Sequence, residues 1–213
     1  MLLKKNIPLK YILGKIKFEL IIVLAYTCLF DLFHRLNPEI NTEIPLAIPS
    51  VIGTVISLLL AFKSNQAYDR WWEARIIWGA ITNDSRTLIR QLITFYKEPI
   101  FSIEANNFIE KMAKRQVAWN YSLGNSLRGE NVYKPISGLL TPEEFDYVKK
   151  HKHVPNAILM LHGKDLKDAL REEKINEYQQ IELDKTLTRF CDHMGKCERI
   201  KTTIFPTTYG LYI

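Results

Sequence analysis

The chain has 213 residues, 47% of them hydrophobic and 24% charged, and carries a net charge of +6. Its mean hydropathy of -0.10 does not by itself separate it from a soluble domain, and the positive charge fits an anionic membrane surface, nucleic acid or an anion path equally well. The three cysteines, Cys28, Cys191 and Cys197, argue against a disulfide framework and fit a reducing compartment.

The N-terminal part predicts a membrane segment that is retained. Residues 1–17 are rich in lysine and are expected to lie in the cytosol. The apolar run that follows, LIIVLAYTCLFDLF (20–33), has no small-residue cleavage site and ends at charged residues, so it does not read as a cleavable signal. Glu19 and Asp31 at its ends favour a helix that lies in a bundle over an isolated span.

The second apolar run, IPLAIPSVIGTVISLLLAF (44–62), holds 19 residues without a charge and is long enough to cross a bilayer. The loop between the two runs (36–45) contains acids but no lysine, whereas basic residues flank the other side of the hairpin. The positive-inside rule therefore predicts a transmembrane hairpin over 18–62 with both ends in the cytoplasm. A buried helical hairpin of a soluble protein is the alternative.

From Lys63 onward the sequence predicts a cytosolic helical domain (63–206). Apolar residues at helical spacing over 63–97 predict that the second membrane helix continues into a long cytosolic helix. Further helices are expected over 104–122, from Thr141-Pro142-Glu143-Glu144 to a break at 151–155, over 156–162, and as one or two helices over 164–198. The residues between them, including Gly124, read as loop.

Three tryptophans and a cluster of charges fall in KSNQAYDRWWEARIIWG (63–79), directly after the membrane exit. One interpretation is a packed subunit interface, in which Arg70 or Arg75 offsets the repulsion between Asp69 and Glu73. The other interpretation is an aromatic belt at the membrane surface, with arginines reaching toward water.

Catalytic, metal and nucleic-acid chemistry find little support in the sequence. Cys191, His193 and Cys197, with or without the histidines at 151, 153 and 162, match no standard zinc spacing. No hydrolase or P-loop motif occurs, and the basic residues are spread among acids. We therefore expect no enzyme activity, no cofactor, no metal and no nucleic-acid partner.

One face of the second apolar helix is a candidate functional surface. Thr54 (or Val55), Leu58 and Phe62 recur at helical spacing and share that face. Contact with lipid or with another helix is the simple explanation. A hydrophobic constriction lining a pore is the functional one.

Three segments resemble the bacterial branch of the bestrophin family: AFKSNQAYDRWWEARIIWG (61–79), RQVAWNYSLGNSLRG (115–129) and CERIKTTIFPTTYGLYI (197–213). The resemblance implies a homopentameric channel, best known for chloride, with four membrane helices per subunit. It implies that the second membrane helix lines a narrow hydrophobic neck. Residues 207–213 would begin the third membrane helix, and the third and fourth helices would follow Pro206.

Carried over by position, the resemblance places the neck at Thr54, Leu58 and Phe62, although family members usually have bulky apolar residues at all three positions. It places a second, cytosolic constriction at Ile175. The residues that it implies for subunit packing are Asp69, Arg70, Trp71, Trp72, Glu73, Arg75, Glu198 and Arg199.

The expectation is thus an all-helical, multi-pass protein of the bacterial inner membrane, with two of four expected spans present and a cytoplasmic N-terminus. It would conduct anions, with chloride as the expected ion and with copies of itself and lipid as partners. A membrane-anchored scaffolding protein without a pore is the alternative.

Overall fold

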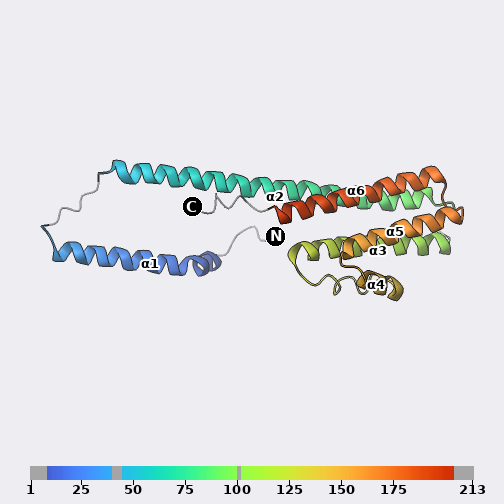
Figure 1. Ribbon diagram of the computed structural model, residues 1–213, viewed down its shortest axis with the longest axis horizontal. Coiled ribbons are helices and arrows are strands. Elements are labelled where there is room, and N and C mark those ends of the chain that lie inside the picture. Colours follow the sequence, from blue (N-terminus) through green and yellow to red (C-terminus); the bar gives the residue numbers. More distant parts are fainter. Residues whose placement is uncertain (1–8, 40–44, 100–101, 204–213) are drawn as a thin grey trace. The chain divides into compact units, whose positions relative to one another are not determined.

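The computed structural model describes residues 9–39, 45–99 and 102–203, and these ranges are entirely helical in their regular structure (Figure 1). The helices are α1 (Leu9–Leu36), α2 (Ala47–Phe95), α3 (Ile103–Arg128), α4 (Pro142–Lys149), α5 (Val154–Arg171) and α6 (Glu177–Thr202). The predicted all-helical class is confirmed. The chain divides into two units, residues 1–58 and 59–213, each of which is described by itself.

In the first unit, polar groups are satisfied within the helices while apolar side chains are left uncovered. The hydroxyls of Thr27 and Ser50 each donate to the carbonyl four residues earlier, at 2.8 Å, and Arg35 pairs with Asp31 at 3.0 Å. In contrast, Leu24 is 63% exposed and Leu29 is 66% exposed. This combination suits a helix whose surroundings offer few hydrogen bonds.

Among the described residues, α2 is the helix that is long and apolar enough to cross a membrane. The predicted first span lies in α1, which is 28 residues long but carries Lys17, Glu19 and Asp31. With these charges, α1 is long enough but not apolar enough to count as a membrane-crossing helix by composition. Two spans in this chain therefore remain a prediction.

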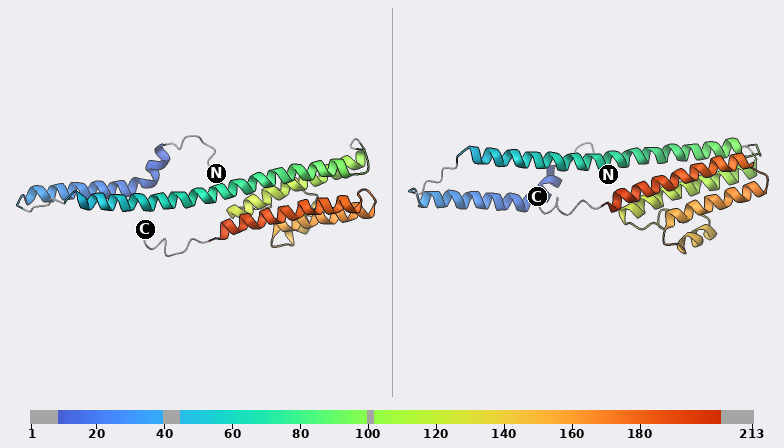
Figure 2. Two further views of the ribbon diagram at one scale, coloured as in Figure 1. Left: turned by 90° about the horizontal axis from the view of Figure 1, so that it is seen from above. Right: turned by 45° about the horizontal axis from the view of Figure 1, so that its top comes forward.

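In the second unit, the later part of α2 packs with α3, α5 and α6 around one hydrophobic core (Figures 1 and 2). Leu88 of α2, Trp119 of α3, Ile158 of α5 and Phe190 of α6 are all fully buried. The rings of Trp119 and Phe190 lie 5.0 Å apart between centroids. Burial of large side chains from four helices gives this unit its own core.

The long helix that the sequence predicts after the second apolar run is confirmed. α2 continues without interruption for 49 residues from Ala47 to Phe95. Its core-facing residues in the second unit, Ile77, Ile81, Leu88 and Leu92, recur at helical spacing and are buried.

The helix start predicted at Thr141 is also confirmed. The Thr141 hydroxyl accepts from the backbone N–H of Glu144, and the Glu144 carboxylate accepts from the backbone N–H of Thr141. Pro142 occupies the first turn, where its missing N–H has no helical partner to lose.

Two predicted helix boundaries were wrong. Gly124 lies buried inside α3, which ends at Arg128. The helix is capped by Gly129, whose φ of 71° a glycine adopts without strain. Likewise α5 runs through Gly163 to Arg171, and the chain turns at residues 172–176 instead. A glycine within a helix costs only about 1 kcal/mol relative to alanine, which tertiary packing can outweigh.

Several sequence predictions fall outside the described residues. They include most of the N-terminal cytosolic segment, the middle of the loop between the two apolar runs, and residues 207–213, where a third membrane helix was expected to begin.

Candidate functional site

The predicted neck residues lie on one face of α2, and no other described residue covers them. Leu58 and Phe62 are each 55% exposed. Thr54, one turn earlier, is exposed too, and its hydroxyl donates to the carbonyl of Ser50 at 2.9 Å. Because that hydroxyl is hydrogen-bonded to its own helix, Thr54 exposes mainly its methyl group. This face of α2 is therefore more apolar than a threonine at this position suggests.

An aromatic cluster follows on α2. The rings of Tyr68 and Trp72 stack at 6.3 Å, and Trp71 lies 5.6 Å from Tyr68. The guanidinium of Arg75 lies 5.6 Å from the centroid of the Trp71 ring. Trp71 is 41% and Trp72 48% exposed, so the cluster is available for contact with lipid or with another copy of the chain.

The charged residues of the same stretch join α2 to the end of α6. Glu73 pairs with Arg199 at 2.7 Å, and Arg70 donates to the carbonyl of Thr203. Glu73 thus has a positive partner in Arg199, far along the chain, while the predicted offset of the Asp69–Glu73 repulsion by Arg70 or Arg75 stays a prediction. Asp69, one turn before Glu73, is exposed.

Glu198, the other C-terminal residue that the resemblance singled out, joins α6 to α5. Its carboxylate lies 2.7 Å from Nε2 of His153, the residue that caps the N-terminus of α5. The middle of α2, the N-terminus of α5 and the C-terminal part of α6 are thus joined by polar contacts that use Glu73, Glu198 and Arg199. All of these contacts lie within one chain.

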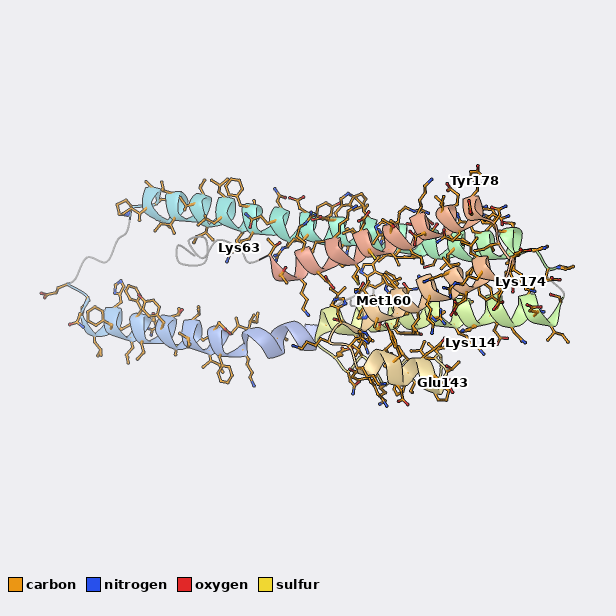
Figure 3. The ribbon with its side chains drawn as sticks, turned by 45° about the vertical axis from the view of Figure 1, so that its right-hand side comes forward. Lys63, Lys114, Glu143, Met160, Lys174 and Tyr178 are labelled. Carbon is orange, nitrogen blue, oxygen red and sulfur yellow. The ribbon has the colours of Figure 1, made fainter. Side chains whose placement is uncertain are left out.

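Ile175 lies in the turn between α5 and α6 and is only 4% exposed. The backbone N–H of Lys97 donates to the carbonyl of Lys174 at 2.8 Å, and the Lys174 ammonium pairs with Glu104 at 2.7 Å (Figure 3). These contacts join the turn to the segment after α2 and to the first turn of α3. A side chain that narrows a pore must be exposed on the surface of its own chain. The burial of Ile175 disfavours that role.

The cysteines and histidines near the C-terminus serve different purposes. His193 contacts the Asp84 carboxylate at 2.9 Å, as does Arg189. Burial raises the pKa of the Cys197 thiol to about 11, and the thiol of Cys191 is exposed. In the described ranges, no three His, Cys, Asp or Glu side chains gather in a way that could hold a metal ion.

A buried ionic cluster between α3, α4 and α5 escaped the sequence reasoning. Arg115 is 1% exposed and pairs with Glu144 and, at 2.8 Å, with Asp165, which also accepts from Lys111 at 2.8 Å. The cluster forms the floor of a cleft of about 650 Å³, with Glu143 of α4 and Met160 of α5 on its walls (Figure 3). Removing Arg115 would leave Glu144 and Asp165 with only the half-exposed Lys111 as a counter-charge, which is costly for buried carboxylates.

His162 lies beside this cluster and is fully buried. Its Nδ1 is 3.3 Å from the sulfur of Met112, and its Nε2 has no partner within the described chain. Burial, followed by the charges of Arg115 and Lys111, holds the pKa of His162 well below its ordinary value. No sequence pattern marks this residue, because its surroundings come from three separate helices.

The family profile described as "Bacterial/Fungal Bestrophin protein" matches residues 8–213 of the chain. A voltage-dependent anion channel-forming protein of Ralstonia nicotianae is 29% identical over 158 residues, which are 74% of this chain and 50% of that protein. A protein with the same descriptive name from Escherichia coli strain K12 is 27% identical over 158 residues, again 74% of this chain and 50% of the relative. The chain spans about half the length of the curated relatives it matches.

Solved structures give the same result. A variant of a bacterial bestrophin homologue from Klebsiella pneumoniae superposes with a TM-score of 0.79 at 26% identity, over 93% of this chain and 72% of that one. A second variant of the homologue gives a TM-score of 0.80 at 25% identity, over 93% and 72% of the two chains.

Proposed function

This chain belongs to the bacterial and fungal bestrophin family and is an all-helical membrane protein, and on that premise we propose that it is the pore-forming subunit of an anion channel. Five copies would surround one pore, with chloride as the expected ion. The family membership points to a channel and not to an enzyme. The protein would reside in the bacterial inner membrane, with the N-terminus and the second unit in the cytoplasm.

The observation that carries the proposal is the uncovered apolar face of α2. Leu58 and Phe62 are large, apolar and about half exposed, and they lie in the helix that is long and apolar enough to cross a membrane. Relatives at 27–29% identity bear the name of anion channel-forming proteins. A ring of such side chains would force an ion to lose water without gaining polar ligands, which limits the current.

We place the neck at Thr54, Leu58 and Phe62 and limit the proposed constriction to α2, since Ile175 is buried within its own subunit. The aromatic cluster of Tyr68, Trp71 and Trp72 is proposed to contact a neighbouring subunit or the membrane surface. The ion pair of Glu73 and Arg199 would hold each subunit's α2 against its α6.

The decisive test is Phe62→Ala in a full-length form that carries all four expected spans, studied as single channels in planar bilayers. Removing five phenyl rings widens the neck, so conductance should rise. Leu60→Ala is the matched control, because Leu60 is also apolar and 61% exposed but lies on the opposite side of α2. It should leave conductance unchanged.

A charge at Leu58 gives a second readout. Leu58→Glu should shift permeation toward cations and Leu58→Lys toward anions, because a charged ring acts at close range in a low-dielectric wall. If Phe62→Ala changes neither conductance nor selectivity in a folded, pentameric and conducting protein, the assignment of the neck is wrong. A full-length protein that is stably monomeric in detergent would remove the pore and favour a scaffolding role.

A further inference from the structure

One side of α2 stays uncovered along its whole course through the second unit. Ile77, Ile81, Leu88 and Leu92 face the core, whereas the opposite side is exposed. The exposed side carries the stripe Trp72, Ile76, Gly79, Asn83, Arg86 and Arg90. Nothing within the described part of the chain covers this stripe.

The stripe continues the face on which the proposed neck lies. At 3.6 residues per turn, Ile76 follows Leu58 by about five turns and therefore returns to the same side of the helix. Arg90 follows Ile76 by about four turns, and Arg86 lies one turn before it at the border of the stripe. Because α2 is one unbroken helix, the side that carries Leu58 also carries Arg90.

Arg86 and Arg90 make no salt bridge within the described residues, unlike most other arginines of the second unit. Arg115 pairs with Glu144 and Asp165, Arg189 with Asp84, and Arg199 with Glu73. Two like charges one turn apart on a helix repel each other. The repulsion between Arg86 and Arg90 therefore destabilises α2 slightly, and no salt bridge within the described residues offsets it.

The acids of α2 do not cancel these charges. Asp84 is engaged by Arg189 and His193, and Glu73 by Arg199, all on the side of α2 that faces α6. Asp69 is exposed, but it precedes Arg86 by about 25 Å along the axis, well beyond the Debye length at physiological salt.

We propose that Arg86 and Arg90 form two rings of positive charge that concentrate anions at the cytosolic mouth of the pore. The inference rests on the proposed function, since the rings exist only if several copies of α2 surround an axis. The rings lie about 36–42 Å from Phe62 along α2. They act on ions that approach the neck from the cytosol, and the neck itself lies outside their range.

Because the proposed rings lie far from Phe62, their effect on the current should depend on the salt concentration. Charges in a vestibule raise the local concentration of counter-ions, and salt screens them, with a Debye length of about 30 Å at 10 mM and 3 Å at 1 M. Chloride current from the cytosolic side should therefore depend on the arginines in dilute salt and be independent of them in concentrated salt.

The test compares single-channel chloride currents of the full-length protein at about 10 mM and 1 M salt. In the double variant Arg86→Gln/Arg90→Gln, current from the cytosolic side should fall on the order of tenfold in dilute salt, the lower end of the effect of focused charge. At 1 M the variant and the unsubstituted protein should agree. Arg86→Lys/Arg90→Lys should retain the current, because only charge is required.

Lys167→Gln serves as the control, since Lys167 is an exposed cation on α5 and makes no salt bridge in the described chain. The Lys167→Gln variant should leave the chloride current unchanged at both salt concentrations. Equal currents in dilute salt for the double Gln variant and the unsubstituted protein would overturn the inference and leave the channel proposal intact. Loss of the pentamer in the Gln variant would overturn it as well, by assigning the arginines to subunit contacts. An unsubstituted protein that does not conduct would refute the channel proposal itself.

Discussion

At the scale of single residues, the second unit is unusual in how much charge it buries. Arg115 sits at 1% exposure with two carboxylates and one lysine within reach, and His162 beside it is fully buried and uncharged. Buried ion pairs contribute little net stability, but losing one partner is costly. The cluster therefore specifies how α3, α4 and α5 meet more than it strengthens their association.

His162 gives a prediction about pH. The pKa of His162 is lowered in the folded chain, whereas in the unfolded chain this pKa is about 6.5. The unfolded state thus binds more protons as the pH falls below that value, and stability drops. The contribution of His162 should fall by up to about 1.4 kcal/mol between pH 7.5 and 5.5, the limit for a group that stays neutral in the folded chain. Denaturation of the chain in detergent at both pH values measures it.

His162→Gln is the reference for that measurement, because glutamine does not titrate. Its absolute stability will be lower, but its loss of stability between the two pH values should be smaller than that of the unsubstituted chain by the same amount. An identical pH dependence for the two chains would mean that His162 is protonated in the folded state too.

At the scale of elements, short helices here depend on their caps. α4 has eight residues and positions Glu144 for its pair with Arg115, and both the hydroxyl of Thr141 and the carboxylate of Glu144 cap its start. So short a helix has little stability of its own. Its cap is therefore coupled to the ionic cluster.

Thr141→Ala should destabilise the chain by about 1 kcal/mol, because it leaves the backbone N–H of Glu144 without its acceptor. Amide hydrogen exchange across residues 142–149 should accelerate in this variant. Thr141→Ser retains the hydroxyl and should behave like the unsubstituted chain. Equal destabilisation by serine and alanine would point to the lost methyl group in place of the cap.

At the scale of the whole molecule, the orientation in the membrane follows from charge asymmetry. Lysines crowd the N-terminus and basic residues follow residue 62, whereas the loop between the apolar runs is acidic. Positive charge is retained on the cytoplasmic side during insertion. The loop should thus lie on the outer side of the membrane and the second unit in the cytoplasm.

Cysteine labelling in intact cells checks this orientation. In a background without Cys28, Cys191 and Cys197, a cysteine at Asn41 should react with a membrane-impermeant thiol reagent. One at Asn106, which is exposed on α3, should react only after lysis. Labelling of Asn106→Cys but not Asn41→Cys in intact cells would reverse the topology and put the proposed arginine rings outside the cell.

What the sequence by itself determined is local in its physical origin. The uncharged run to Phe62 and the helical periodicity beyond it predicted the uninterrupted α2, and Thr141 and Glu144 predicted the start of α4. Each of these signals acts over a few turns of one helix, where spacing and capping chemistry decide the outcome.

Only the tertiary structure decided which distant groups meet. Glu73 finds Arg199, Arg115 finds Glu144 and Asp165, and Ile175 becomes a core residue in a turn that no proline or glycine marks. These outcomes depend on packing between helices far apart in the chain, whose contact energies outweigh local preferences such as that of Gly163. The proposed neck and arginine rings would depend on the assembly of several copies, because their residues are ones that the described part of the single chain leaves uncovered.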